Sequence, residues 1–285
     1  MMHFHTPKSL EDALSLIADP STRVLAGGTD FYPALGGAPA QMPIVHLGRI
    51  PDLSGITRDG AQWRFGATTT WTDIARADLP PLFTALRQAA REVGSIQIQN
   101  AGTIAGNLCN ASPAADGVPP LLALDASVEL ASASGRRVLP LADFITGVRK
   151  TALRPGELVT AVLVPDQPTW RSAFGKLGAR RYLVISIAMV AVAVELDETG
   201  AIQSARIAIG SCSPVARRLP QVEAALVGLN PKEERLGACL AEADLSPLSP
   251  LDDVRASASY RLDAARELIR RAIIAATTAA AEGKG

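Results

Sequence analysis

Helical and strand patterns follow one another at the start of the chain. Apolar residues recur at helical spacing over 9–19, and this segment opens with a serine followed three positions later by an acidic residue, which is typical of a helix start. Short apolar runs at 23–28 and 43–48 indicate two buried strands. Residues 29–37 between them fit a short helix. This strand–helix–strand order predicts a small parallel sheet.

The pattern changes after a turn-rich link at 51–60. Alternating and continuous apolar runs then indicate strands, and longer segments with helical spacing indicate helices. A proline at the start of the second helix favours that assignment. The predicted strands are 62–67, 127–132, 136–141 and 157–165, and the predicted helices are 70–79 and 80–93.

A second domain is indicated beyond a boundary at 166–170. Three strands are predicted, the last two joined by a hairpin turn at 197–200, and three helices follow them. The strands span 171–178, 182–196 and 201–211, and the helices 219–228, 231–242 and 255–282. We therefore expect domains at 1–168 and 169–285, the first with subdomains at about 1–56 and 57–168.

Composition removes several function classes. The chain has 28 basic and 28 acidic residues, so we expect no partner among nucleic acids or anionic membrane surfaces. Its three cysteines lie at least 27 positions apart, which excludes a local zinc or iron–sulfur motif and fits a reducing compartment. The longest apolar run, 183–194, is too short to span a bilayer as a helix. We expect a cytoplasmic protein without membrane insertion.

Two glycine-rich turns, 24–30 and 101–107, are the candidates for ligand binding. Glycine lets backbone N–H groups approach a ligand, and successive N–H groups can hold phosphate oxygens. Neither turn matches a common nucleotide-binding signature, so a tight turn and close packing remain the alternative. Polar side chains that could add hydrogen bonds are Thr29, Asp30, Thr103, Asn107 and Asp116.

Residues for acid–base or nucleophilic catalysis are scarce. With three histidines and no GxSxG elbow, the sequence offers little material for a catalytic pair or triad. Cys109 lies in a run of small residues, where a packed side chain is the expected role. Residues 101–120 are instead rich in alanine and glycine, as expected for a backbone that lies directly against a ligand.

Six segments in order resemble the FAD-binding (medium) subunit of the xanthine dehydrogenase and carbon monoxide dehydrogenase family of molybdenum hydroxylases. The resemblance covers nearly the whole chain. The segments read "VLAGGTD", "QIQNAGTIAGNLCNASPAADGVPPLLALDA", "LADFITGVRKTALRPGELVTAVLVP", "KLGARRYLVISIAMVAVAV", "IGSCSPVARRLPQVEAAL" and "DDVRASASYRLDAARELIRRAI".

The resemblance implies an α+β fold. The first domain would be the two-subdomain FAD-binding fold of the vanillyl-alcohol oxidase and MurB type. The second would be the carbon monoxide dehydrogenase flavoprotein C-terminal domain, a three-stranded sheet with a helical bundle. FAD would be bound non-covalently.

The resemblance also implies which residues contact FAD. The first turn would wrap the diphosphate, the second would approach it from the other side, and Asp116 would hold a sugar hydroxyl. Two apolar residues would border the flavin ring, with a lysine nearby. The implied set is Leu25, Ala26, Gly27, Gly28, Thr29, Asp30, Phe31, Gly102, Thr103, Ile104, Ala105, Gly106, Asn107, Ala115, Asp116, Leu158, Val159 and Lys176.

Some positions depart from the family pattern. Ala105 stands where many members have glycine, and Gln99 where many have arginine. The acidic residue that often follows the paired arginines 180–181 is absent, which removes one expected contact to the adenosine end. The scattered cysteines exclude the extra cluster-binding loop of the benzoyl-CoA type.

The implied function is electron transfer within an oxidoreductase. The partners would be a molybdopterin-containing large subunit and a [2Fe-2S] small subunit, in a heterotrimer or its dimer, and the flavin would pass electrons to an external acceptor. Two alternatives stay open: a self-contained FAD-dependent oxidase or reductase of the same fold, and a nucleotide-binding scaffold without flavin. The sequence does not identify the substrate.

Overall fold

A computed structural model describes residues 3–231 and 234–278. The chain folds as two compact units, each assembled from separate stretches of sequence. Unit 1 comprises the chain up to Ile74, Ser95–Ala111 and Asp125–Asp166, and unit 2 comprises Ala75–Gly94, Ser112–Leu124 and the chain from Gln167 onward. The continuous domains expected from the sequence, 1–168 and 169–285, stay a prediction.

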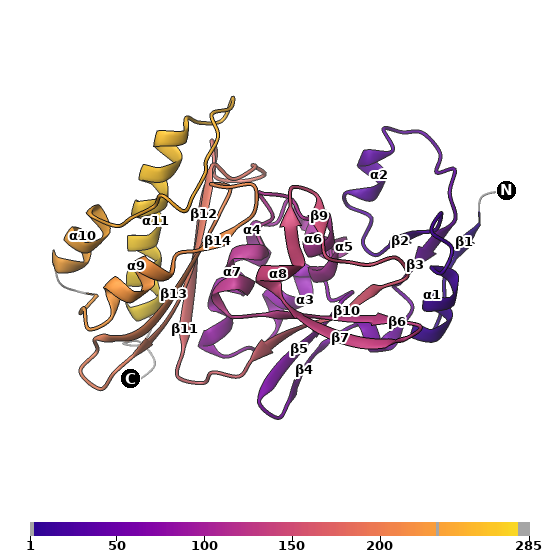
Figure 1. Ribbon diagram of the computed structural model, residues 1–285, viewed down its shortest axis with the longest axis horizontal. Coiled ribbons are helices and arrows are strands. Elements are labelled where there is room, and N and C mark those ends of the chain that lie inside the picture. Colours follow the sequence, from indigo (N-terminus) through magenta and orange to yellow (C-terminus); the bar gives the residue numbers. More distant parts are fainter. Residues whose placement is uncertain (1–2, 232–233, 279–285) are drawn as a thin grey trace. The chain divides into compact units, whose positions relative to one another are not determined.

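Unit 1 begins with the small parallel sheet that the sequence predicts. Its strands are β1 (Phe4–His5), β3 (Ile44–His46) and β2 (Arg23–Leu25), in that spatial order. Helix α1 (Leu10–Leu16) begins where the Ser9 hydroxyl accepts the Asp12 N–H at 3.1 Å. The helix lies beside this sheet (Figure 1). Its apolar residues pack with those of the sheet around buried Ala13 and Val45. The predicted short helix is α2 (Phe31–Ala34).

The second sheet of unit 1 has five antiparallel strands in the order β4-β5-β10-β6-β7. The edge strand β4 lies in the link expected to be only turns, because its mixed polar residues give no strand pattern. Strand bounds are β4 Ile56–Asp59, β5 Gln62–Gly66, β6 Ser127–Ser132, β7 Gly135–Pro140 and β10 Leu158–Pro165, and the hairpin strands are β8 Ile145–Gly147 and β9 Lys150–Thr151. Helices are η1 Pro51–Leu53, α3 Trp71–Arg76, which begins in this unit, α5 Ile96–Ala101, α6 Ile104–Asn110 and α8 Leu141–Phe144.

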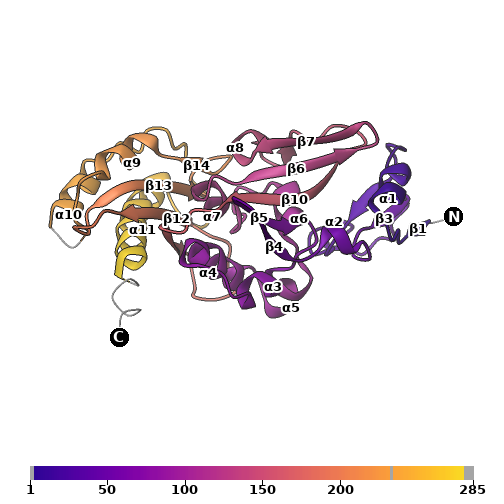
Figure 2. The same cartoon turned by 90° about the horizontal axis from the view of Figure 1, so that it is seen from below.

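Unit 2 is built on an antiparallel sheet in the order β11-β12-β13-β14. The sequence predicts its first three strands, and the two-residue β14 extends them. Helix α11 packs along β11 and β12, as Figures 1 and 2 show, over an aliphatic core. The strands are β11 Arg171–Leu177, β12 Ala188–Leu196, β13 Ile202–Gly210 and β14 Arg217–Arg218. The helices are η2 Pro81–Phe83, α4 Thr84–Glu92, α7 Val118–Ala123, α9 Pro220–Leu226, α10 Glu234–Ala241 and α11 Ala258–Thr278.

Strand β12 is shorter than predicted. The apolar run suggests a strand from 182, but pairing starts at Ala188. Leu183 has φ +53, and its carbonyl accepts a hydrogen bond from Arg180 Nε at 3.1 Å, so the backbone turns away from the ladder. The predicted end of the last helix, 279–282, and the start of the helix at 231–242 extend beyond the described residues. Within the described residues, no helix combines the length and hydropathy needed to cross a membrane.

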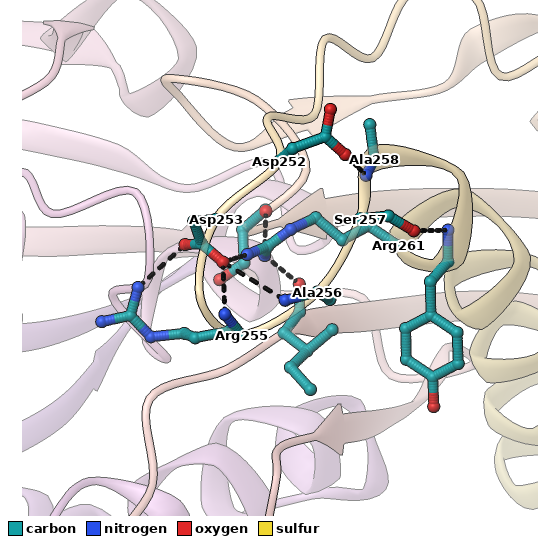
Figure 3. Close-up of polar contacts among 10 residues, drawn as sticks. Asp252, Asp253, Arg255, Ala256, Ser257, Ala258 and Arg261 are labelled. Carbon is teal, nitrogen blue, oxygen red and sulfur yellow. Dashed lines mark hydrogen bonds and ion pairs between the residues drawn. The ribbon is translucent and has the colours of Figure 1, made fainter.

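A buried arginine fixes the start of α11 (Figure 3). Arg261 is only 3% exposed, and it donates to the carbonyls of Ile187 at 2.5 Å and Ser211 at 3.1 Å. Asp253 supplies its counter-ion at 2.7 Å. The backbone N–H of Arg255, together with the two arginine side chains, lowers the pKa of Asp253 to about 2.

We expect Asp253→Asn to lower the melting temperature of the protein by several degrees. The amide oxygen still accepts the backbone N–H groups, but the buried Arg261 loses its negative partner. Asp252→Asn is the matched control, because Asp252 accepts the Ala258 N–H at 2.6 Å and an asparagine caps a helix equally well. Melting curves of both variants measure the difference.

The stabilising contribution of Asp253 should decrease as the pH falls. The pKa of Asp253 is below its ordinary 3.8, so its contribution is complete above pH 4 and is lost as the pH falls toward 2. The gap between wild type and Asp253→Asn should therefore close over that range. A gap equally large at pH 2.5 and pH 6 would show that the charge of Asp253 is not what stabilises the fold.

Candidate cofactor-binding site

The first glycine-rich turn presents free backbone donors. Residues Gly27–Thr29 follow β2, and Gly28 has φ +71, a conformation that favours glycine. Within the described parts of the chain, no group accepts a hydrogen bond from the N–H of Gly27, Gly28 or Thr29. Three successive N–H groups are thus available to an anionic ligand, as the sequence predicts for this turn.

The second glycine-rich segment is different. Residues 104–107 form the first turns of α6, and the Thr103 hydroxyl caps that helix by accepting the Gly106 N–H at 3.1 Å. The N–H groups of Gly102, Ile104 and Ala105 donate to backbone carbonyls at 2.6, 3.0 and 3.2 Å. Apart from the N–H of Thr103, the N–H groups of residues 102–107 are used by helix and loop bonds, so the expectation of successive free donors is wrong for this segment.

The two segments lie directly against each other within unit 1. A Cβ atom on Gly27 would stand 1.8 Å from the Ala101 carbonyl oxygen, so the two backbones touch. A Cβ on Gly102 would lie 3.5 Å from the Thr29 hydroxyl. Gly27 and Gly102 therefore do allow close packing, which is the alternative explanation of these glycines. It also places the free donors of the first turn beside the second segment.

Asn107 contributes an unsatisfied polar atom to the second segment. Its side-chain oxygen is buried, and no partner for it exists in the described structure. Buried polar atoms in proteins normally have hydrogen-bond partners, so this atom is available to a water molecule or a ligand. An amide can present either an acceptor or two donors. The free N–H groups and this amide fit a ligand that carries phosphate and hydroxyl groups.

The apolar pair predicted to border a flavin ring lies in β10. Leu158 and Val159 are both buried, and Leu158 packs with Val45 and Leu47 in the core around α1. Their proposed contact with FAD stays a prediction.

Unit 2 contains the other predicted residues, Ala115, Asp116 and Lys176. Lys176 Nζ lies 2.9 Å from Asp116 Oδ2 and also donates to the Glu92 carbonyl at 3.2 Å. The Ser186 hydroxyl donates to Asp116 Oδ1 at 3.2 Å. Both charged side chains are at least nine-tenths buried. The sequence suggests Asp116 and Lys176 separately, and the structure shows that they form one ion pair.

Burial raises the pKa of Asp116 to about 6, although Lys176 and Ser186 both favour the charged form. Desolvation of the carboxylate therefore outweighs its partners. A proton held more tightly in the folded state stabilises that state below the ordinary pKa of 3.8, and this contribution is lost as the pH rises through about 6.

Arg149 is a charged residue near the first turn that the sequence does not single out. Its guanidinium NH1 lies 4.0 Å from Asp30 Oδ1 and donates to Asn110 at the end of α6. No signature marks this arginine, because its place depends on the hairpin between β8 and β9.

Comparison with known families decides the identity of the two halves. Residues 1–167 match the family described as FAD binding domain in molybdopterin dehydrogenase. Residues 173–276 match the CO dehydrogenase flavoprotein C-terminal domain. The chain belongs to the family of FAD-binding subunits of the molybdenum hydroxylases. It is an oxidoreductase component, and FAD is its cofactor, as the resemblance implies.

Relatives of this FAD-binding subunit match it along nearly its whole length. The nicotine 6-hydroxylase medium subunit of Paenarthrobacter nicotinovorans is 33% identical over 279 residues, covering 96% of this chain and 97% of the relative. The xanthine dehydrogenase FAD-binding subunit of Escherichia coli O157:H7 is 32% identical, with 99% and 97% covered. A chain in the crystal structure of the Cu,Mo-CO dehydrogenase superimposes with a TM-score of 0.88 at 30% identity, covering 97% of this chain and 98% of that one.

We expect Asp116→Asn to gain stability relative to wild type as the pH rises from 4 to 7. Wild type must ionise a buried carboxyl over this range, and asparagine does not. The shift from 3.8 to about 6 corresponds to a relative change of about 2–3 kcal/mol in the free energy of unfolding.

Denaturant unfolding at several pH values measures this change. Asp78→Asn, which alters an exposed carboxyl in the same unit, is the control and should show no comparable trend. A constant difference between Asp116→Asn and wild type from pH 4 to 7 would contradict a raised pKa for Asp116.

Proposed function

We propose that the chain holds FAD non-covalently and serves as the electron-transfer subunit of a multi-subunit molybdenum hydroxylase. Electrons would arrive from [2Fe-2S] clusters of a small subunit and leave to an external acceptor. The observation that carries the binding part is the first turn, with three free N–H groups packed against the second glycine segment.

The first turn is suited to the diphosphate of FAD. Its N–H groups supply donors without a side chain in the way, and Gly28 adopts its positive φ without strain. Residues Leu25–Phe31 would wrap the diphosphate, with Gly102–Asn107 on the other side and the Asn107 amide as a further contact. FAD, when bound, supplies the exchange between one-electron and two-electron carriers.

The remaining proposed contacts are Leu158, Val159, Ala115, Asp116 and Lys176. The family resemblance supports all five. For Lys176 there is a further reason, since its ammonium is fixed by Asp116 and by the Glu92 carbonyl. Such a lysine offers a positive charge at a defined place, which would favour an anionic reduced flavin.

The proposed partners are a molybdopterin-containing large subunit and a [2Fe-2S] small subunit, in a heterotrimer or its dimer. Relatives named as medium or FAD-binding subunits support this assembly. Proton transfer and substrate oxidation would belong to the large subunit, which agrees with the scarcity of acid–base residues in this sequence. A cytoplasmic location is part of the proposal.

The first experiment is the absorption spectrum of the purified chain and identification of the flavin that denaturation releases. FAD at about one equivalent supports binding. Copurification from the native host with molybdenum and iron–sulfur subunits supports the electron-transfer role. FAD without such partners, together with turnover of a small substrate by the isolated chain, would favour a self-contained oxidase or reductase instead.

We expect Gly27→Ala to weaken FAD binding at least tenfold, since the added methyl collides with the Ala101 carbonyl and must separate the two segments. Gly147→Ala is the control in the same unit, because its Cβ would lie 3.7 Å from the nearest atom, an ordinary contact. Titration followed by flavin fluorescence measures both affinities. Equal affinity of the two variants would show that the contact between the segments does not shape the site.

A further inference from the structure

Arg149 occupies a backbone position that suits other residues better. It lies in the two-residue turn between β8 and β9, and its φ is +56. Glycine or asparagine adopts this conformation readily, whereas a long side chain is disfavoured there. A residue held in such a conformation is a sign of a functional demand on its side chain.

The surroundings keep Arg149 in this conformation. Its N–H donates to the Ala111 carbonyl at 2.9 Å, and Ala111 itself has φ +45 as the last residue of the α6 cap. The guanidinium NH1 donates to the Asn110 carbonyl at 3.3 Å and to the Asn110 side-chain oxygen. The hairpin is thus fastened to the end of the second glycine segment.

The same guanidinium reaches the first turn. NH1 lies 4.0 Å from the carboxylate of Asp30, the residue after Gly27–Thr29. Both side chains are more than half exposed, so this ion pair adds little stability. In the described structure every hydrogen bond of the Arg149 side chain uses NH1, which leaves Nε and NH2 free for a ligand.

We propose that Arg149 is a further cofactor-binding residue, whose guanidinium supplies positive charge to the phosphates of FAD. This inference rests on the proposed function. Three observations carry it: the strained backbone, the position at the junction of the two glycine segments, and the free donors. Arginine forms strong, paired hydrogen bonds with phosphate, which the neutral N–H groups of the first turn cannot replace.

The test compares Arg149→Asn with Arg149→Lys. Asparagine tolerates the positive φ, so the fold should keep or exceed its wild-type melting temperature. FAD affinity of Arg149→Asn should fall about tenfold or more, and the dependence of affinity on salt should become shallower. Arg149→Lys keeps the charge but lacks the paired donors of the guanidinium, so its affinity should lie between those of wild type and Arg149→Asn. Fluorescence titration of flavin-free protein with FAD at several salt concentrations provides these values.

Lys150→Asn is the matched control, because it removes the same charge from the neighbouring exposed residue. Wild-type affinity and salt dependence in Arg149→Asn would overturn the inference while leaving the proposed function intact. An equal loss of FAD affinity in Arg149→Asn and Lys150→Asn would also overturn it, since the effect would then come from net positive charge and not from the position of Arg149. If wild type binds no FAD, either alone or in its native complex, the proposed function and this inference both fail.

Discussion

The contact between Gly27 and the Ala101 carbonyl governs the architecture of the candidate site. Two chain segments more than seventy residues apart meet backbone to backbone, with no room for even one methyl group. Because they meet so closely, the Gly27–Thr29 donors, the Asn107 amide and the Arg149 guanidinium belong to one unit. The small residues of these segments carry no functional groups, but their lack of side-chain bulk permits this arrangement.

The charged groups near the glycine segments of unit 1 differ in burial from two ionic clusters of unit 2. In unit 1 the ionic groups near the glycine segments, Asp30 and Arg149, are exposed and paired only loosely. In unit 2 the Asp116–Lys176 pair and Arg261 are withdrawn from water and hydrogen-bonded on several sides. Buried pairs contribute little net stability but fix side chains in one geometry. The equal numbers of basic and acidic residues in the sequence do not reveal which charges are buried.

Local pattern predicts much of the fold. The start of α1 at Ser9, the parallel N-terminal strands and the hairpin at 197–200 follow from spacing and turn residues alone. The features that the sequence does not predict depend on contacts between residues in the folded chain. Strand β12 starts later than the predicted 182, where Arg180 donates a hydrogen bond to the Leu183 carbonyl, and the edge strand β4 exists through pairing with β5. The pairing of Asp116 with Lys176 and the position of Arg149 likewise arise only once the chain is folded.

A site built from main-chain donors depends little on the identity of the surrounding side chains. The N–H groups of Gly27, Gly28 and Thr29 are the same whatever side chains surround them. Selection therefore acts on the backbone conformation of the turn and on the absence of large side chains in it. A site of this kind can be inherited while most neighbouring residues drift. Full-length relatives that share only a third of their residues with this chain are what such a mode of recognition allows. It also explains why the site is hard to see as a chemical motif.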